Sequence, residues 1–188
     1  MPSESSVFNS SVVPFRLVFL MWGVFYIEMH VGINFSVFGL VPRTFFGLIG
    51  IFTAPLIHGD VLHLISNTVP LLFLGSVLFF FYARIGGHVF FRGYFWTNIL
   101  VWLFGRPASS HIGASGLVYA LAFFLIFFGI FRRDFLSIFI SVIVVLLYGG
   151  VFYGILPSDP RISWESHLAG ALVGIASALT FSAKRNVS

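Results

Sequence analysis

The sequence predicts an all-α membrane protein, a bundle of six transmembrane helices with a long loop between the first two. Of its 188 residues, 59% are hydrophobic and only 9% are charged, whereas a soluble domain averages about 25% charged residues. Apolar stretches of roughly 15 to 23 residues recur along the chain, and about 20 such residues span a bilayer. The length fits one domain, and neither an internal repeat nor a soluble appendage is visible. Residues 1–188 are therefore expected to form a single transmembrane domain, with a short polar N-terminal tail at 1–13.

The six spans are assigned from the apolar stretches in chain order. The first is expected to be retained as a span, because no A-x-A-like signal-peptidase site follows it. The third is short and contains Arg92 and Asn98. The predicted spans cover residues 15–31, 61–83, 90–104, 115–131, 135–155 and 166–181.

The loop at 32–59 contains a further apolar stretch, residues 44–57. About 14 residues are too few to cross a bilayer, and Pro55 would interrupt a helix there. Several interleaved glycines and prolines instead predict an irregular segment that lies in the membrane interface and satisfies its backbone through its own turns.

The basic residues predict the orientation of the bundle. Cytoplasmic loops carry an excess of lysine and arginine. With both termini in the cytoplasm, seven of the ten basic residues lie on the inner side: Arg16, Arg84, Arg92, Arg132, Arg133, Lys184 and Arg185. Only Arg43, Arg106 and Arg161 lie outside. Because the charges are scattered among short loops, the net charge of +4 does not indicate nucleic-acid binding.

Polar residues open the second, fourth and sixth spans. In the predicted topology these spans all run from outside to inside, so His63, Ser115 and His167 share one depth near the outer face. Polar and ionisable side chains are costly inside a membrane, and they commonly mark functional sites there.

Ser115 lies between Gly113 and Gly116 at the predicted start of a helix. A helix N-terminus offers free backbone N–H groups and a dipole that stabilise a developing anion. A small-residue stripe below His167, which includes Gly170 and Gly174, would let the fourth and sixth spans approach closely. This arrangement predicts a Ser–His pair, although a packing serine and a capped histidine are the ordinary structural alternatives.

The remaining candidates surround that pair. Tyr119 lies one helical turn after Ser115 and is expected to pack against the imidazole. His63 and Asn67 face the same way and are expected to donate hydrogen bonds to an oxyanion, or to form an interhelical clamp. No carboxylate is well placed to complete a triad, and Asp60 is interpreted as a helix N-cap. His58 is expected at the mouth of the site as a supporting residue.

These motifs, in this order, resemble those of the rhomboid family of intramembrane serine proteases, in its compact six-helix bacterial form. The matching residues are His58, His63-x-x-x-Asn67, Gly113-Ala-Ser115-Gly116 with Tyr119, and His167-x-x-Gly170 with Gly174. The resemblance implies Ser115 as nucleophile, His167 as general base and acid, and an oxyanion hole from His63, Asn67 and the Ser115 backbone. The chain departs from the family in its first loop, where Pro42-Arg43 replaces the Trp-Arg pair that members often have.

The resemblance also implies a cellular setting. The substrates would be single-pass transmembrane proteins within the lipid bilayer, no cofactor is implied, and nucleic acid is not a partner. The site would lie near the outer face of a bacterial inner membrane.

Two other functions fit the sequence less well. A metal-dependent protease is disfavoured, because the chain has no H-E-x-x-H motif and no cysteine. A non-catalytic rhomboid-like protein that binds substrate helices is the alternative, but such proteins are expected to have lost the serine or the histidine.

Overall fold

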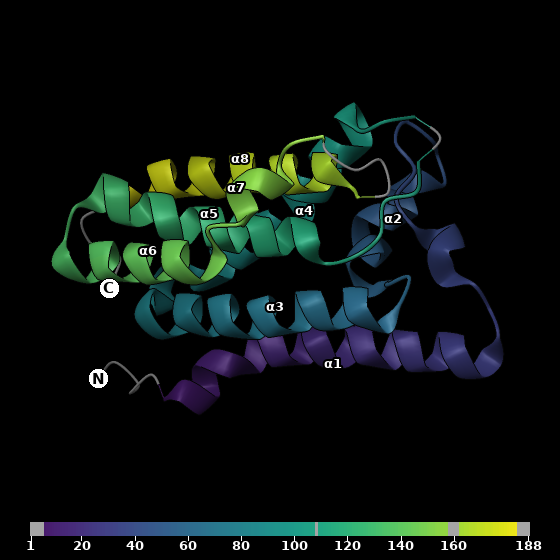
Figure 1. Cartoon of the computed structure of the whole chain (residues 1–188), viewed down its shortest axis with the longest axis horizontal. Helices are drawn as coiled ribbons and strands as arrows, with labels where there is room; N and C mark the ends of the chain where they lie inside the picture. The colour runs from purple at the N-terminus through teal and green to yellow at the C-terminus, as the bar shows by residue number, and fades with distance from the viewer. Residues whose placement is uncertain (1–5, 108, 158–161, 184–188) are drawn as a thin grey trace.

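A computed structural model describes residues 6–107, 109–157 and 162–183. In these residues the chain forms eight α-helices and two short 3-10 helices. The six longer helices run side by side along one axis (Figure 1). They are α1 (Val7–Val31), α3 (Val61–Phe81), α4 (Ala83–Phe104), α5 (Ser115–Arg132), α6 (Phe135–Tyr148) and α8 (Trp164–Ser182).

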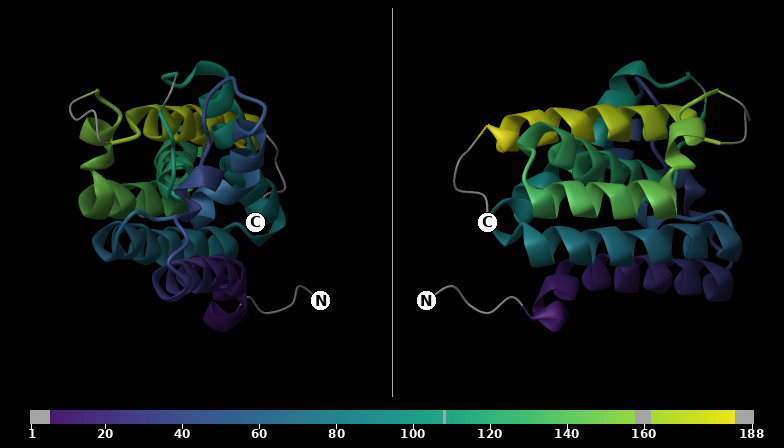
Figure 2. Two further views of the ribbon diagram at one scale, coloured as in Figure 1. Left: turned by 90° about the vertical axis from the view of Figure 1, so that its right-hand side faces the viewer. Right: turned by 60° about the vertical axis from the view of Figure 1, so that its left-hand side comes forward.

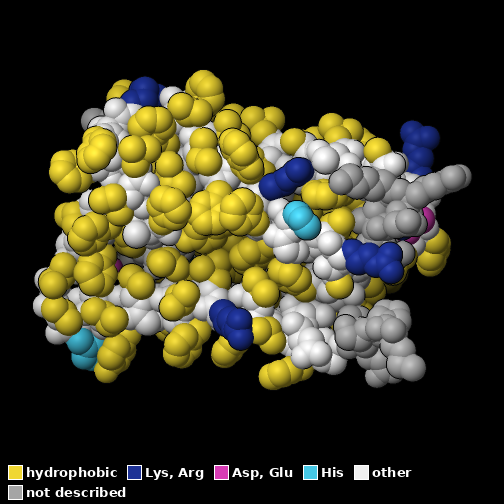
Figure 3. Space-filling model, turned by 180° about the vertical axis from the view of Figure 1, so that it is seen from behind, with side chains coloured by type: hydrophobic (Ala, Val, Ile, Leu, Met, Phe, Trp, Pro, Cys, Tyr) yellow, Lys and Arg dark blue, Asp and Glu magenta, His cyan; other side chains and the backbone are white. Residues whose placement is uncertain are grey.

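The long helices fall where the six spans were predicted, and three of them have the length and apolar composition of a membrane span. These three are α1, α3 and α5. Apolar side chains cover much of the face shown in Figure 3, and many large hydrophobic residues are exposed along the described helices, as expected of an integral membrane protein. α6 is apolar but shorter, so the six-span count stays a prediction.

The centre of the bundle is α5. Seen end-on, it lies among α3, α6 and α8 (Figure 2), and it packs most extensively against α8. Leu121, Phe124 and Phe128 on α5 are wholly buried. α1 begins and α8 ends at one end of the bundle, whereas α3, α5 and α8 all begin at the other (Figure 1). Residues that open these three helices therefore share one end of the molecule.

The loop between α1 and α3 contains three short helices: η1 (Phe35–Phe38), α2 (Gly47–Thr53) and η2 (Ala54–Leu56). Its interfacial position in a membrane stays a prediction. Leu40 pairs with His111 of the α4–α5 loop through two backbone hydrogen bonds of 2.9 and 2.8 Å. Arg43, at the position of the departure from the family pattern, donates to the Leu103 carbonyl oxygen at the end of α4. The first loop is therefore attached to the C-terminal end of α4 and to the segment that leads into α5.

The first helix begins earlier than the span predicted at 15–31 and includes the second half of the expected polar tail at 1–13. Residues 7–13 form the first turns of α1, because the Ser6 side chain accepts a hydrogen bond from the Asn9 amide and caps the helix. Pro14 follows inside the helix. Residues 1–5 lie outside the described part of the chain.

Two other predicted boundaries also need correction. The span at 135–155 is not one helix, since α6 ends at Tyr148 and Gly149 and Gly150 separate it from the short α7 (Val151–Gly154). Glycine lowers helix stability by about 1 kcal/mol relative to alanine, and two adjacent glycines favour a break. The third span begins at Ala83, not at 90, because only Tyr82 separates α3 from α4.

Candidate active site

Ser115 and His167 meet between α5 and α8. Ser115 is the first residue of α5, and His167 lies in the first turn of α8. The Ser115 Oγ is 3.0 Å from the His167 Nε2. Gly113 just before the serine has φ +101°, a conformation that glycine adopts without strain. This turn brings the chain into α5 with the hydroxyl facing α8.

The other ring nitrogen of His167 is held by a backbone group. His167 Nδ1 is 2.8 Å from the carbonyl oxygen of Gly154, the last residue of α7. A carbonyl can only accept, so Nδ1 carries the proton and Nε2 presents its lone pair to the Ser115 hydroxyl. The arrangement gives the tautomer that a general base needs, without a carboxylate.

Tyr119 fixes the face of the imidazole. Its ring lies parallel to that of His167, with centroids 4.0 Å apart and an interplanar angle of 5°. A Cβ on Gly154 would fall 1.7 Å from the Tyr119 Oη, so only glycine fits against the tyrosine there. Stacking and the Gly154 carbonyl together hold the ring in one plane. The sequence indicated the stacking partner, but it gave no signal for the carbonyl beyond a glycine-rich stretch at 149–154.

Close approach of the two helix backbones brings the serine and the histidine together. A Cβ on Gly170 would lie 2.2 Å from the Gly116 carbonyl oxygen, and one on Gly174 would lie 2.4 Å from the Ala120 carbonyl oxygen. Neither backbone atom can move aside as a flexible side chain can. Gly116 is itself confined, because its Cβ would meet the Thr97 methyl group at 2.8 Å.

Two possible oxyanion donors come from α3. A Cβ on Gly113 would lie 2.6 Å from His63 Nε2 and 3.8 Å from Asn67 Nδ2, so both groups lie beside the turn before Ser115. Asn67 is buried and gives one of its two N–H groups to the His63 carbonyl at 2.8 Å, which leaves the second for another acceptor. Asp60 caps α3 as predicted, accepting from the His63 amide at 2.8 Å.

Comparison with known proteins shows the family to which the chain belongs. The family profile described as the rhomboid domain matches residues 45–184. An uncharacterized protein of Mycobacterium tuberculosis and one of Mycobacterium bovis are each 36% identical over 176 residues, covering 88% of this chain and 72% of the relative. An uncharacterized protein of Mycobacterium leprae is 37% identical over 151 residues, covering 71% of this chain and 56% of the relative. The chain belongs to the rhomboid family. Rhomboid proteins are generally serine proteases that act within membranes.

In this rhomboid protein the Ser115–His167 pair opens into a cavity of about 840 Å³. One side is formed by His63, Asn67 and Pro70 of α3, and the opposite side includes Tyr148 and Val151 of the α6–α7 region. Pockets of about 300–1,000 Å³ hold drug-sized ligands. The cavity next to Ser115 is therefore large enough to hold a ligand.

His58 supports the rhomboid site from behind. It is buried, and its ring packs edge-to-face on that of His63 with centroids 5.0 Å apart. Burial, and then the neighbouring His63, lower the pKa of His58 to about 4, because an imidazolium loses its hydration there. His58 is therefore neutral at physiological pH.

Glu165 and His111 at this end of the bundle make contacts with partners other than His167. Among the described residues, His, Asp and Glu side chains form no group of three or more that could hold a metal ion. Glu165 pairs with Arg106, and His111 contacts Ser163 through Nδ1. The sequence did not indicate either pairing.

Proposed function

We propose that this rhomboid protein is an intramembrane serine endopeptidase that cleaves single-pass transmembrane substrates with Ser115 and His167. The observation that carries the proposal is the 3.0 Å contact between Ser115 Oγ and a His167 Nε2 whose tautomer is set by the Gly154 carbonyl. A serine that only packs helices has no need of an oriented base.

The reaction follows from these positions. His167 Nε2 takes the hydroxyl proton as Ser115 Oγ attacks the scissile carbonyl carbon, and the carbonyl oxygen becomes an oxyanion. In this proposal the backbone N–H of Ser115, with His63 and Asn67, donates to that oxygen; the closeness of His63 and Asn67 to Gly113 supports this role. The imidazolium then gives its proton to the leaving amine as the peptide bond breaks, which leaves an acyl-enzyme. Water, deprotonated by His167, hydrolyses the ester and restores the serine.

The setting of the reaction is part of the same proposal. Three apolar helices long enough to span a bilayer support a site inside the membrane, and the seven-to-three distribution of basic residues supports cytoplasmic termini. The serine, the histidine and the possible oxyanion donors would then lie near the outer face. The bacterial relatives support the inner membrane of a bacterium as the location.

Reconstitution tests the proposal. The purified protein is placed in liposomes with a single-pass reporter whose transmembrane segment contains small, helix-destabilising residues. We expect two fragments with the parent protein and none with Ser115→Ala or His167→Ala. Uncleaved reporter that nonetheless co-purifies equally with the parent and with both variants would contradict the protease and favour a substrate-binding rhomboid.

A further inference from the structure

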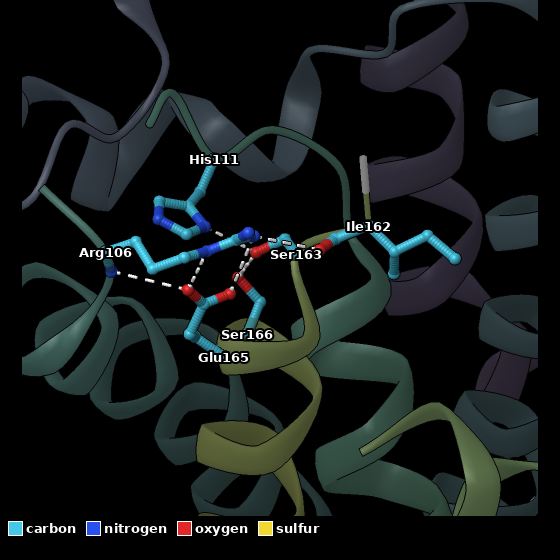
Figure 4. Close-up of polar contacts among 6 residues, drawn as sticks. All are labelled: Arg106, His111, Ile162, Ser163, Glu165 and Ser166. Carbon is cyan, nitrogen blue, oxygen red and sulfur yellow. Dashed lines mark hydrogen bonds and ion pairs between the residues drawn. The ribbon is translucent and has the colours of Figure 1, made fainter. Parts of the chain in front are cut away.

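An ion pair joins the α4–α5 loop to the first turn of α8 at the site end of the bundle (Figure 4). Arg106 Nε and Glu165 Oε1 are in direct contact, and Arg106 Nη2 donates to Glu165 Oε2 at 3.2 Å. Arg106 Nη2 also donates to the Ile162 carbonyl oxygen at 3.1 Å, just before α8 begins. Such two-point contacts fix the relative direction of the two groups as well as their distance.

A chain of polar contacts runs beside the ion pair. His111 Nδ1 lies 2.5 Å from Ser163 Oγ, which lies 2.6 Å from Ser166 Oγ (Figure 4). His111 belongs to the same loop as Arg106 and comes four residues before Ser115. Its backbone is also paired with Leu40 of the first loop. The loop that leads into Ser115 is therefore attached to α8 through Arg106 and His111. It is also attached to the first loop, where the Ser110 hydroxyl donates to the Ser36 carbonyl oxygen and the Gly113 N–H to the Ala54 carbonyl oxygen.

Burial gives the ion pair more weight than a surface contact has. The Glu165 side chain is 8% exposed and that of Arg106 is 34% exposed. A buried carboxylate that loses its cationic partner is strongly destabilised, whereas exposed ion pairs contribute little. Burial also lowers the pKa of His111, so at neutral pH this histidine contributes hydrogen bonding and not a second positive charge.

The pair sits next to the reacting groups without touching them. Glu165 is two residues before His167, and a Cβ on Gly116 would lie 3.3 Å from the carbonyl oxygen of the intervening Ser166. A shift of the first turn of α8 would therefore move His167 Nε2 relative to Ser115 Oγ. A displacement of about 1 Å at a reacting centre costs on the order of a hundredfold in rate.

We propose that the Arg106–Glu165 ion pair, with the His111–Ser163–Ser166 chain, is a positioning device that sets Ser115 against His167. This inference rests on the protease function proposed above. Arg106 and Glu165 are positioning residues, since they act through the backbone of the loop and of α8.

The test compares kcat and KM for the parent, Glu165→Gln, Arg106→Gln and the double variant, all reconstituted with the reporter. We expect kcat to fall about ten- to a hundredfold with KM nearly unchanged. The double variant should be no worse than the poorer single variant, because each single change already breaks the pair. Arg106→Lys should recover only part of kcat, since an ammonium group lacks the fork that makes two contacts.

A matched control lies at the opposite end of the bundle. Arg132 Nε is 2.7 Å from Asp134 Oδ2, so Arg132→Gln removes an ion pair far from Ser115. Its kcat should stay at the parent value. If Glu165→Gln also keeps the parent kcat, or loses no more than Arg132→Gln does, the positioning device is wrong. If Glu165→Gln fails to fold, Ser163→Ala tests the other half of the device, because it removes the hydroxyl that contacts both His111 and Ser166; a parent kcat in this variant would contradict the proposal.

A second readout separates this inference from the protease itself. In histidine-labelled protein, the Nδ1 proton that His167 shares with Gly154 should give a low-field NMR signal, assigned by its loss in His167→Ala. We expect Glu165→Gln to shift or broaden this signal and Arg132→Gln to leave it unchanged. An inactive parent in which Glu165→Gln still moves the signal would overturn the protease and keep the positioning. If the parent is active and Glu165→Gln changes neither the NMR signal nor kcat, the positioning role of the ion pair is wrong and the protease function stands.

Discussion

Two helix pairs in this bundle, α5 with α8 and α1 with α3, pack in different ways. In the first pair, glycines on α8 face backbone carbonyl oxygens of α5 at positions where a Cβ would fall within 2.4 Å. In the second, contact is made by side chains, among them Pro14 against Gly75 and a 2.9 Å hydroxyl contact between Ser11 and Ser76. In the most apolar 18-residue stretch of α5, 67% of the residues are buried inside the bundle. In the corresponding stretches of α1 and α3 the share is 33%.

The difference shows which helix pair must keep its relative position most closely. Side-chain packing tolerates small shifts because rotamers adjust, but backbone-to-backbone contact leaves little freedom. The helices that carry Ser115 and His167 are the pair with that tight contact. Variants that loosen one interface or the other should therefore separate activity from stability.

The largest effect is expected from the two reacting residues themselves. Ser115→Ala and His167→Ala should each reduce reporter cleavage to background, because the hydroxyl and its base act as one unit. The double variant should be no worse than either single variant. A double variant that is slower than both single variants would show that they contribute independently. Folded yield serves as the control in each case.

The next effect distinguishes the two interfaces. Gly170→Leu or Gly174→Leu should push α8 away from α5 and lower the cleavage rate by about a hundredfold or more, since even about 1 Å is costly. Gly75→Leu at the α1–α3 contact should lower the thermal midpoint in detergent, whereas its cleavage rate should stay closer to that of the parent than the rates of the two α8 variants do. Gly23→Leu, where nothing lies within 4 Å of the position, is the neutral control. Parent rates in both α8 variants would contradict the tight-interface account.

A smaller effect is expected from the oxyanion donors of α3. Losing one such donor costs about 10²–10³ in rate in a well-studied serine protease. Asn67→Ala should cost less than that here, because the Ser115 N–H and His63 remain. Measured kcat should fall while KM changes little. If Asn67→Ala is inactive while His63→Ala is unaffected, Asn67 binds substrate directly and the shared oxyanion role is wrong.

The smallest effect concerns His58 and appears as a pH dependence of stability. The pKa of this buried histidine is lowered from 6.5 to about 4 in the folded protein, so between these values the unfolded chain binds a proton that the folded chain does not. Stability should therefore fall as pH falls from about 6.5 to about 4, by up to about 3 kcal/mol from this group. Thermal midpoints in detergent should decline less steeply across this range in His58→Gln than in the parent. Equal slopes would contradict the assignment to His58.

Much of this arrangement could be predicted from the sequence, because apolar length and helix-opening motifs are local signals. Ser115, His167 and Tyr119 were identified from their spacing, and the structure brings the three side chains together. The break at Gly149 and Gly150 was missed because the surrounding residues remain uniformly apolar. The role of the Gly154 carbonyl could not be predicted, since any residue supplies a carbonyl and only the fold decides which one faces a histidine.

The Arg106–Glu165 pair was missed for a related reason. The two residues are 59 positions apart and carry no motif, so only the packing of the α4–α5 loop on α8 brings them together. The distribution of basic residues predicted on which side of the membrane Arg106 lies. It did not indicate which side chain Arg106 contacts. Long-range polar pairs of this kind require the structure.

The most direct test of the central claim is labelling by a fluorophosphonate, which reacts with a serine activated by a neighbouring base. Purified parent protein in detergent should be labelled at one site, which mass spectrometry should place on Ser115. Ser115→Ala and His167→Ala should not be labelled, whereas Arg132→Gln should be labelled at the parent rate. An unlabelled, folded parent protein, or labelling that persists in His167→Ala at the parent rate, would contradict a Ser115 activated by His167.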